Sequence, residues 1–169
     1  GGRSHWKTDY VETPVSPLYP FGFGLSYTSF AYANLQITPA QVSAGEQVSV
    51  EVDVSNSGNR AGDEVVQLYT HQLAPYVTRP LKELKGFRRI HLEAGETATV
   101  RFLLPVNHQA YLDRDMQLVV SPGLVDVMIG SSSADIHLTG TFAIAGATTP
   151  VQRAFITPVE VEAKSTTQS

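Results

Sequence analysis

The chain has 169 residues, no cysteine and a formal net charge of −4 at pH 7. A chain of this length can bury enough apolar surface for one hydrophobic core, so we expect one main domain. The lack of cysteine excludes a disulfide framework, a thiolate metal site and a cysteine nucleophile. The acidic balance argues against a nucleic-acid partner. No apolar run approaches the roughly 18 residues that span a bilayer, so we expect no membrane partner.

Composition divides the chain into residues 1–29, 30–145 and 146–169. The first segment is rich in aromatic residues and interrupted by three prolines, and we expect it to be irregular. The second is dense in Val, Leu, Ile, Thr and Phe, and we expect it to form the folded domain. The third is small and polar, which favours a disordered tail. Its few apolar residues leave open a strap that docks on a neighbouring domain.

Period-two alternation of apolar and polar residues predicts strands within the second segment. The clearest case is QVSVEVDVS, whose four valines should share one face, and similar runs follow at 63–71, 96–105, 117–130 and 135–145. Residues 106–115 could form one or two helical turns, and no longer amphipathic helix is found. Seven or so short strands separated by turn clusters predict an all-β fold. A two-layer antiparallel sandwich fits best, and a small closed barrel is the competing architecture.

The motifs of common hydrolases are missing from the sequence. Paired catalytic carboxylates must flank a cleft, whereas the adjacent acids Asp63 and Glu64, like Asp113 and Asp115, are interpreted as solvated surface groups. The five histidines lack the spacing of a zinc site, and no G-x-S-x-G turn marks an activated serine. We therefore expect no catalytic residue, no metal site and no cofactor in this chain.

Two clusters could contact a partner. The first is aromatic and consists of Trp6, Tyr10, Tyr19, Phe21, Phe23 and Tyr27. These residues are interpreted as anchors that hold an irregular segment against a larger body, with a sugar-stacking platform as the alternative. The second is basic and consists of Arg79, Lys82, Lys85, Arg88 and Arg89, with Phe87 among them. It is interpreted as a solvated face, and an interdomain contact is the second interpretation.

The run SPLYPFGFGLSYTSFAY resembles the linker that enters the C-terminal fibronectin type III-like domain of family-three glycoside hydrolases, the β-glucosidases and β-xylosidases. VEVDVSNSGNRAGDEVVQLY, VTRPLKELKGFRRIHLEAGETATVRFLL and PGLVDVMIGSSSADIHLTGTF resemble successive parts of that domain, in the family's order. The resemblance implies a fibronectin type III-like β-sandwich over residues 30–145. It also implies that residues 1–29 contain the end of an upstream α/β domain and a linker, and that residues 146–169 extend beyond the family domain.

In that family the catalytic nucleophile and the acid/base lie upstream, in a (β/α)8 barrel and an α/β sandwich, and no position here matches either motif. The resemblance therefore implies a non-catalytic accessory module that braces those two domains. The parent enzyme would hydrolyse terminal β-linked sugars with retention. The expected location is extracytoplasmic, periplasmic or secreted, with a cytoplasmic one left open. The expected interdomain contacts are Tyr19, Phe21, Phe23, Tyr27, Arg79 and Phe87.

Three alternatives stay open at this point. A sugar-binding module would use Trp6 and Tyr10 as its substrate-binding candidates. A dimerisation module would join two copies of the parent enzyme through the basic face. A chain that is itself a hydrolase is the least favoured alternative, because no catalytic constellation is present.

Overall fold

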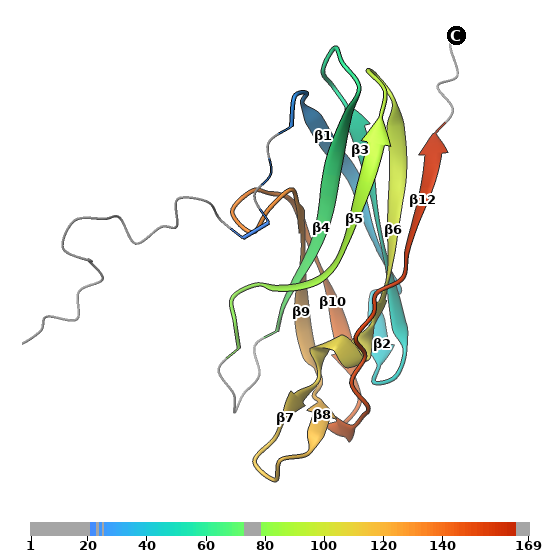
Figure 1. Cartoon of the computed structure of the whole chain (residues 1–169). Helices are drawn as coiled ribbons and strands as arrows, with labels where there is room; N and C mark the ends of the chain where they lie inside the picture. Colours follow the sequence, from blue (N-terminus) through green and yellow to red (C-terminus); the bar gives the residue numbers. More distant parts are fainter. Residues whose placement is uncertain (1–20, 23, 25, 73–78, 165–169) are drawn as a thin grey trace, which may run out of the picture.

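The computed structural model describes residues 21–22, 24, 26–72 and 79–164, which are built almost entirely of β-strands (Figure 1). One sheet, in strand order, contains β1 (Phe30–Thr38), β3 (Gln47–Asn56), β6 (Thr97–Pro105) and β12 (Val159–Lys164). A second contains β2 (Gln41–Ser43), β10 (Ile136–Ala145), β9 (Gly123–Gly130), β4 (Gly62–Gln72) and β5 (Glu83–Leu92). A small third sheet of β11 (Thr149–Pro150), β8 (Leu118–Val120) and β7 (Tyr111–Leu112) lies at one end.

The two larger sheets have separate strand orders and pack face to face. Their strand pairs are antiparallel except for β10 and β2, which are parallel. The prediction of an all-β antiparallel sandwich is therefore confirmed, and the closed barrel is wrong. Within the described residues the expected helical turns reduce to one 3-10 helix, Val106–Gln109. No helix in this part of the chain is long and apolar enough to cross a membrane.

The core lies between the larger sheets, on the faces that the alternation predicts. The four valines of β3 are fully buried, and so are Val100, Phe102 and Leu104 of β6. The facing sheet contributes Val66, Leu68, Val125, Val127, Ile129, Phe142 and Ile144. Burying one such side chain stabilises the fold by about 1.5–3 kcal/mol. β1 has no clear period-two signal because a register shift interrupts its pairing with β3 between Ala33 and Gln36.

The β3–β4 and β5–β6 turns lie at the upper end of the sandwich in Figure 1, and Asn56 joins them. Its side chain is buried, and Nδ2 donates to the carbonyl oxygens of Arg60 at 2.8 Å and Leu92 at 3.0 Å. Oδ1 accepts hydrogen bonds from Thr28 Oγ1 at 2.8 Å and from the Gly58 N–H at 3.1 Å. One amide thereby ties the β3–β4 turn to the end of β5 and to the segment that precedes β1.

Residues 146–164, here termed the C-terminal strap, lie across the sandwich. β11 pairs with β8, and β12 pairs with β6 along its whole length. Between these strands, Thr157 Oγ1 donates to the Lys85 carbonyl oxygen at 2.6 Å, and Asn107 Nδ2 donates to the Gln152 carbonyl oxygen at 3.1 Å. The strap thus adds a fourth strand to one sheet and packs two valines against the core, Val151 and Val159.

We predict that Asn56→Ala lowers the free energy of unfolding by about 2–4 kcal/mol, because several buried donors and acceptors lose their partner at once. Chemical denaturation of the 169-residue chain measures this loss. The control is Asn59→Ala, an exposed position in the same turn, which should leave the free energy of unfolding nearly unchanged. Equal effects of the two substitutions would contradict the role assigned to Asn56.

We also predict that acid lowers the free energy of unfolding through His108, which lies against Ile156 of the strap. Burial, reinforced by the positive charge of Lys85, lowers the pKa of His108, whose ring hydrogen-bonds the Ile156 backbone. The unfolded state therefore takes up a proton as the pH falls below about 6.5, while the folded state resists it. The free energy of unfolding should fall between pH 7.5 and 5.5. His108→Gln should make this fall shallower in urea titrations, and an identical pH profile would argue against the assignment.

Candidate functional site

β4 is buried on both faces along its middle. Val66 points into the core, while Gln67 points to the outer face and yet is only 3% exposed. Part of its cover comes from residues 21–28, here termed the N-terminal segment, of which residues 23 and 25 are not described. The outer face of β4 is therefore already an internal docking surface for a preceding stretch of the same chain.

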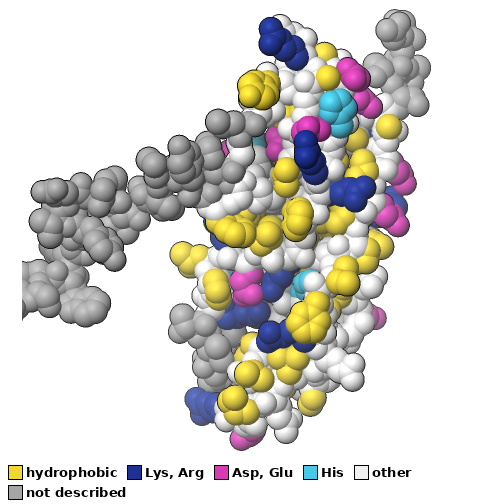
Figure 2. All heavy atoms as spheres, viewed as in Figure 1, with side chains coloured by type: hydrophobic (Ala, Val, Ile, Leu, Met, Phe, Trp, Pro, Cys, Tyr) yellow, Lys and Arg dark blue, Asp and Glu magenta, His cyan; other side chains and the backbone are white. Residues whose placement is uncertain are grey.

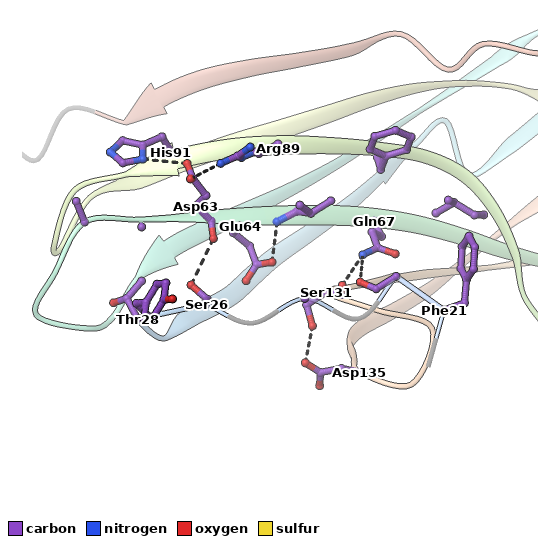
Figure 3. A pocket seen from close by; sticks show the side chains of 18 residues that line it. Phe21, Ser26, Thr28, Asp63, Glu64, Gln67, Arg89, His91, Ser131 and Asp135 are labelled. Carbon is purple, nitrogen blue, oxygen red and sulfur yellow. Dashed lines mark hydrogen bonds and ion pairs between the residues drawn. The ribbon is translucent and has the colours of Figure 1, made fainter. Parts of the chain in front are cut away.

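Gln67 is the residue that holds the N-terminal segment in place. Its Nε2 donates to the Gly22 carbonyl oxygen at 3.1 Å and to the Ser131 carbonyl oxygen (Figure 3). Its Oε1 accepts from the Tyr69 hydroxyl at 2.5 Å. A buried amide with every partner in place is both stable and directional. At Gly22 the segment is thus bound through its backbone, at a position where an added side chain would meet Gln67.

An open groove of about 940 Å³ lies between the N-terminal segment and the outer face of β4 and β5 (Figure 3). Phe21, Tyr27 and Phe87 line it, with exposed fractions of 66%, 96% and 63%. On the face that carries β4 and β5, Figure 2 shows apolar and basic side chains next to one another. The fold thus brings together three residues for which the sequence predicts an interdomain contact, and that role stays a prediction.

One rim of the groove is an exposed ion network. Arg89 Nη2 lies 2.6 Å from Asp63 Oδ2, and His91 Nδ1 lies 3.0 Å from Asp63 Oδ1. The hydrogen bond from Arg89, followed by that from His91, lowers the pKa of Asp63. Exposed pairs of this kind add little to stability. Their consequence here is that the carboxylate of Asp63 is already neutralised by its neighbours on β5.

Beside this rim, the acids Glu64 and Asp135 also line the groove, while Tyr32 and His137 lie behind them and do not line it. Glu64 is half-buried, which raises its pKa, and its Oε1 accepts the Val65 N–H at 2.7 Å. The Tyr32 ring stacks on His137 with centroids 4.2 Å apart, and its buried hydroxyl has no hydrogen-bond partner among the described residues. His137 Nε2 in turn lies 3.3 Å from Asp135 Oδ2. The interpretation of Glu64 as a solvated acid is therefore wrong.

Arg79 lies away from this groove, inside the sandwich. Its side chain is 6% exposed, with Nε 3.3 Å from Glu83 Oε1 and Nη1 2.9 Å from the Gln109 carbonyl oxygen. Lys85 Nζ approaches the other oxygen of Glu83 at 2.8 Å, and its side chain is 10% exposed. The interpretation of the basic cluster as a solvated face is wrong for Arg79 and Lys85, because both side chains are nearly buried and pair with Glu83. The interdomain role of Arg79 stays a prediction.

The remaining predicted site residues lie outside the described part of the chain: Trp6, Tyr10, Tyr19 and Phe23. The sugar-stacking hypothesis therefore stays a prediction. Among the described residues, no group of three or more His, Asp or Glu side chains could hold a metal ion. What the described residues offer is a groove with aromatic side chains, an ion-paired rim at Asp63 and two further acids, Glu64 and Asp135.

Comparison with known proteins identifies the sandwich. Residues 64–133 match the family model of the fibronectin type III-like domain. The chain is 43% identical over 127 residues to a β-xylosidase of Formosa agariphila, covering 75% of this chain and 18% of that protein. It is 39% identical over 148 residues to β-glucosidase BoGH3A of Bacteroides ovatus, covering 83% of this chain and 20% of that protein. A periplasmic β-glucosidase of Salmonella typhimurium is 35% identical over 131 residues, covering 78% of this chain and 17% of that protein.

Solved structures of β-glucosidases contain the same fold over most of this chain. The β-glucosidase of Listeria innocua in complex with glucose superposes with a TM-score of 0.76 at 34% identity, over 85% of this chain and 20% of that one. β-Glucosidase 3B of Thermotoga neapolitana in complex with glucose superposes with a TM-score of 0.72 at 35% identity, over 81% of this chain and 19% of that one. The present chain therefore spans about a fifth of the length of these relatives.

We predict that Gly22→Ala releases the N-terminal segment. Gly22 has a φ of +80°, and an added Cβ would lie 2.3 Å from Gln67 Oε1. The readout is hydrogen exchange of the Ser133 amide, which donates to the Phe21 carbonyl oxygen at 2.9 Å. Its exchange should accelerate about tenfold or more. Gly24→Ala is the control, because a Cβ at Gly24 meets nothing within 4 Å, and equal exchange in both variants would refute the prediction.

Proposed function

The chain belongs to the fibronectin type III-like domains of family-three glycoside hydrolases, and we propose that it is a non-catalytic module that braces the other domains of a longer β-glucosidase-type enzyme. The groove is the observation that carries this proposal. Three aromatic side chains with exposed fractions of 63–96% line one hollow. Large apolar groups gathered in this way are typical of contact surfaces rather than of free solvent-facing strands.

The proposed partner belongs to the same polypeptide. The relatives are about five times as long as the stretch that matches this chain, and the N-terminal segment is bonded along the groove itself. A domain joined to that segment would begin at the groove. A covalent connection of this kind makes docking favourable even where the contact is small, because the effective concentration is high. The upstream barrel and α/β sandwich of the family are the partners proposed.

The substrate and the location follow as parts of the same proposal. The longer enzyme would hydrolyse terminal β-linked sugars with retention, through residues outside this chain. An extracytoplasmic location is supported by the Salmonella relative, whose name describes it as periplasmic. No observation on the described residues favours sugar binding by this module, because its candidates Trp6 and Tyr10 lie outside them. A homodimer contact through the groove is the competing function.

The test compares one substitution in two contexts. Phe87→Ser should leave the thermal midpoint of the isolated 169-residue chain nearly unchanged, because Phe87 is 63% exposed there. In the longer enzyme the same substitution should cost about 2 kcal/mol of stability, since it removes an aromatic ring from a covered contact. Differential scanning calorimetry of both proteins measures the difference.

Leu124→Ser is the matched control, because Leu124 is 67% exposed and does not line the groove. It should have no effect in either context. Equal midpoints for wild type and Phe87→Ser in the longer enzyme would refute bracing through the groove. Light scattering separates the competing function: a dimer of the isolated chain that Phe87→Ser dissociates would show that a second copy covers the groove instead.

A further inference from the structure

The C-terminal strap presents two large apolar side chains to water. Phe155 and Ile156, adjacent in the sequence, are 81% and 75% exposed, although the strap on both sides of them is paired with the sandwich. We propose that this pair, here termed the strap anchor, docks on the same upstream domain as the groove, against an apolar surface with a carboxylate at its rim. The inference rests on the proposed function and deepens it, because it adds a second contact and assigns the chemistry of the partner there.

The backbone that carries the strap anchor is held by the sandwich. The ring of His108 hydrogen-bonds the Ile156 backbone, and Thr157 Oγ1 donates to the Lys85 carbonyl oxygen at 2.6 Å. Two residues further on, Val159 packs against the core. The position of the strap anchor is therefore fixed before a partner arrives, so little conformational entropy is lost when a partner covers it. Large apolar groups that are held in water in this way mark a contact surface.

The strap anchor and the groove lie on either side of one edge strand. β5 is the last strand of its sheet, and the strap contacts it at Lys85 and Gly86. Gly86 permits this approach, because an added Cβ would lie 3.3 Å from Thr157 Cβ. Phe87, the next residue of β5, lines the groove. Figure 2 shows apolar side chains over β5 and over the strap on one face, with Lys and Arg side chains between them. A domain that docks on the groove would therefore meet the strap anchor on the same face.

The charges around the strap anchor favour a partner with an acidic rim. Residues 146–159 contain no acidic residue, and their one basic residue, Arg153, is exposed two positions before the strap anchor. Where the strap contacts β5, Lys85 and Arg79 share the carboxylate of Glu83. These side chains together carry a net positive charge, and a facing carboxylate would be attracted to it. An apolar centre with a charged rim is also the usual composition of a protein contact.

The experiment compares the isolated 169-residue chain with the longer enzyme by differential scanning calorimetry. Phe155→Ser and Ile156→Ser should leave the thermal midpoint of the isolated chain nearly unchanged, because both side chains are exposed there. In the longer enzyme each substitution should lower the midpoint of the domain by about 2–4 °C, since it removes an apolar group from a covered contact. Arg153→Glu should lower the midpoint there as well, whereas Arg153→Lys, which keeps the charge, should not.

Leu124→Ser is again the matched control, because Leu124 is 67% exposed on β9, outside both the groove lining and the strap. A lower midpoint of the isolated chain after Phe155→Ser would overturn the inference, since the ring would then serve the sandwich itself. If Phe87→Ser destabilises the longer enzyme while Phe155→Ser and Ile156→Ser do not, docking stands and the strap anchor is refuted. If none of these three substitutions has an effect there, the proposed function fails as well.

Two further results concern the partner. Equal midpoints for Arg153→Glu and Arg153→Lys in the longer enzyme would refute the acidic rim. Light scattering tests for a second copy in place of the upstream domain. An isolated chain that dimerises, and that Phe155→Ser returns to the monomer, would overturn the inference in favour of that second copy.

Discussion

The dry contact between the two larger sheets is the interaction on which the rest of the molecule depends. The four valines of β3 are fully buried against Val66 and Leu68 of β4 and the apolar residues of β9. Strict alternation along β3 excludes a shift by one residue, because such a shift would expose every valine and bury Ser49 and Glu51. β4 is thereby fixed as a central strand, and its outward-facing residues become available for a second layer of contacts.

That second layer is polar and specific, unlike the core. Asn56 and Gln67 are buried amides whose NH2 groups donate to backbone carbonyl oxygens of several distant segments and whose oxygens accept from the Thr28 and Tyr69 hydroxyls. Each links pieces that the hydrophobic core alone would leave free, namely the turns at one end and the N-terminal segment on the outer face. Removing either amide would leave buried backbone groups unpaired, so these two side chains specify where the irregular segments lie.

The groove follows from these two layers. Gln67 binds the backbone of Gly22. This contact places the neighbouring Phe21 and Tyr27 in the groove lining together with Phe87. The adjacent carboxylates of Asp63 and Glu64 differ in their surroundings, because Asp63 is exposed and contacts Arg89 and His91 of β5, whereas Glu64 is half-buried and accepts the Val65 N–H.

The sequence by itself determined the all-β class, the faces of β3, β4 and β6, and the family resemblance, because these depend on period-two alternation and on local motifs. It also indicated Phe21, Tyr27 and Phe87 as contact residues, since large aromatics stand outside the strand pattern. Only the tertiary structure decided that Arg79 turns inward and that Tyr32 stacks on His137. Those outcomes depend on residues far apart in the chain, such as Gln109, whose carbonyl oxygen accepts a hydrogen bond from Arg79, and pairings between distant elements leave no local pattern in a sequence.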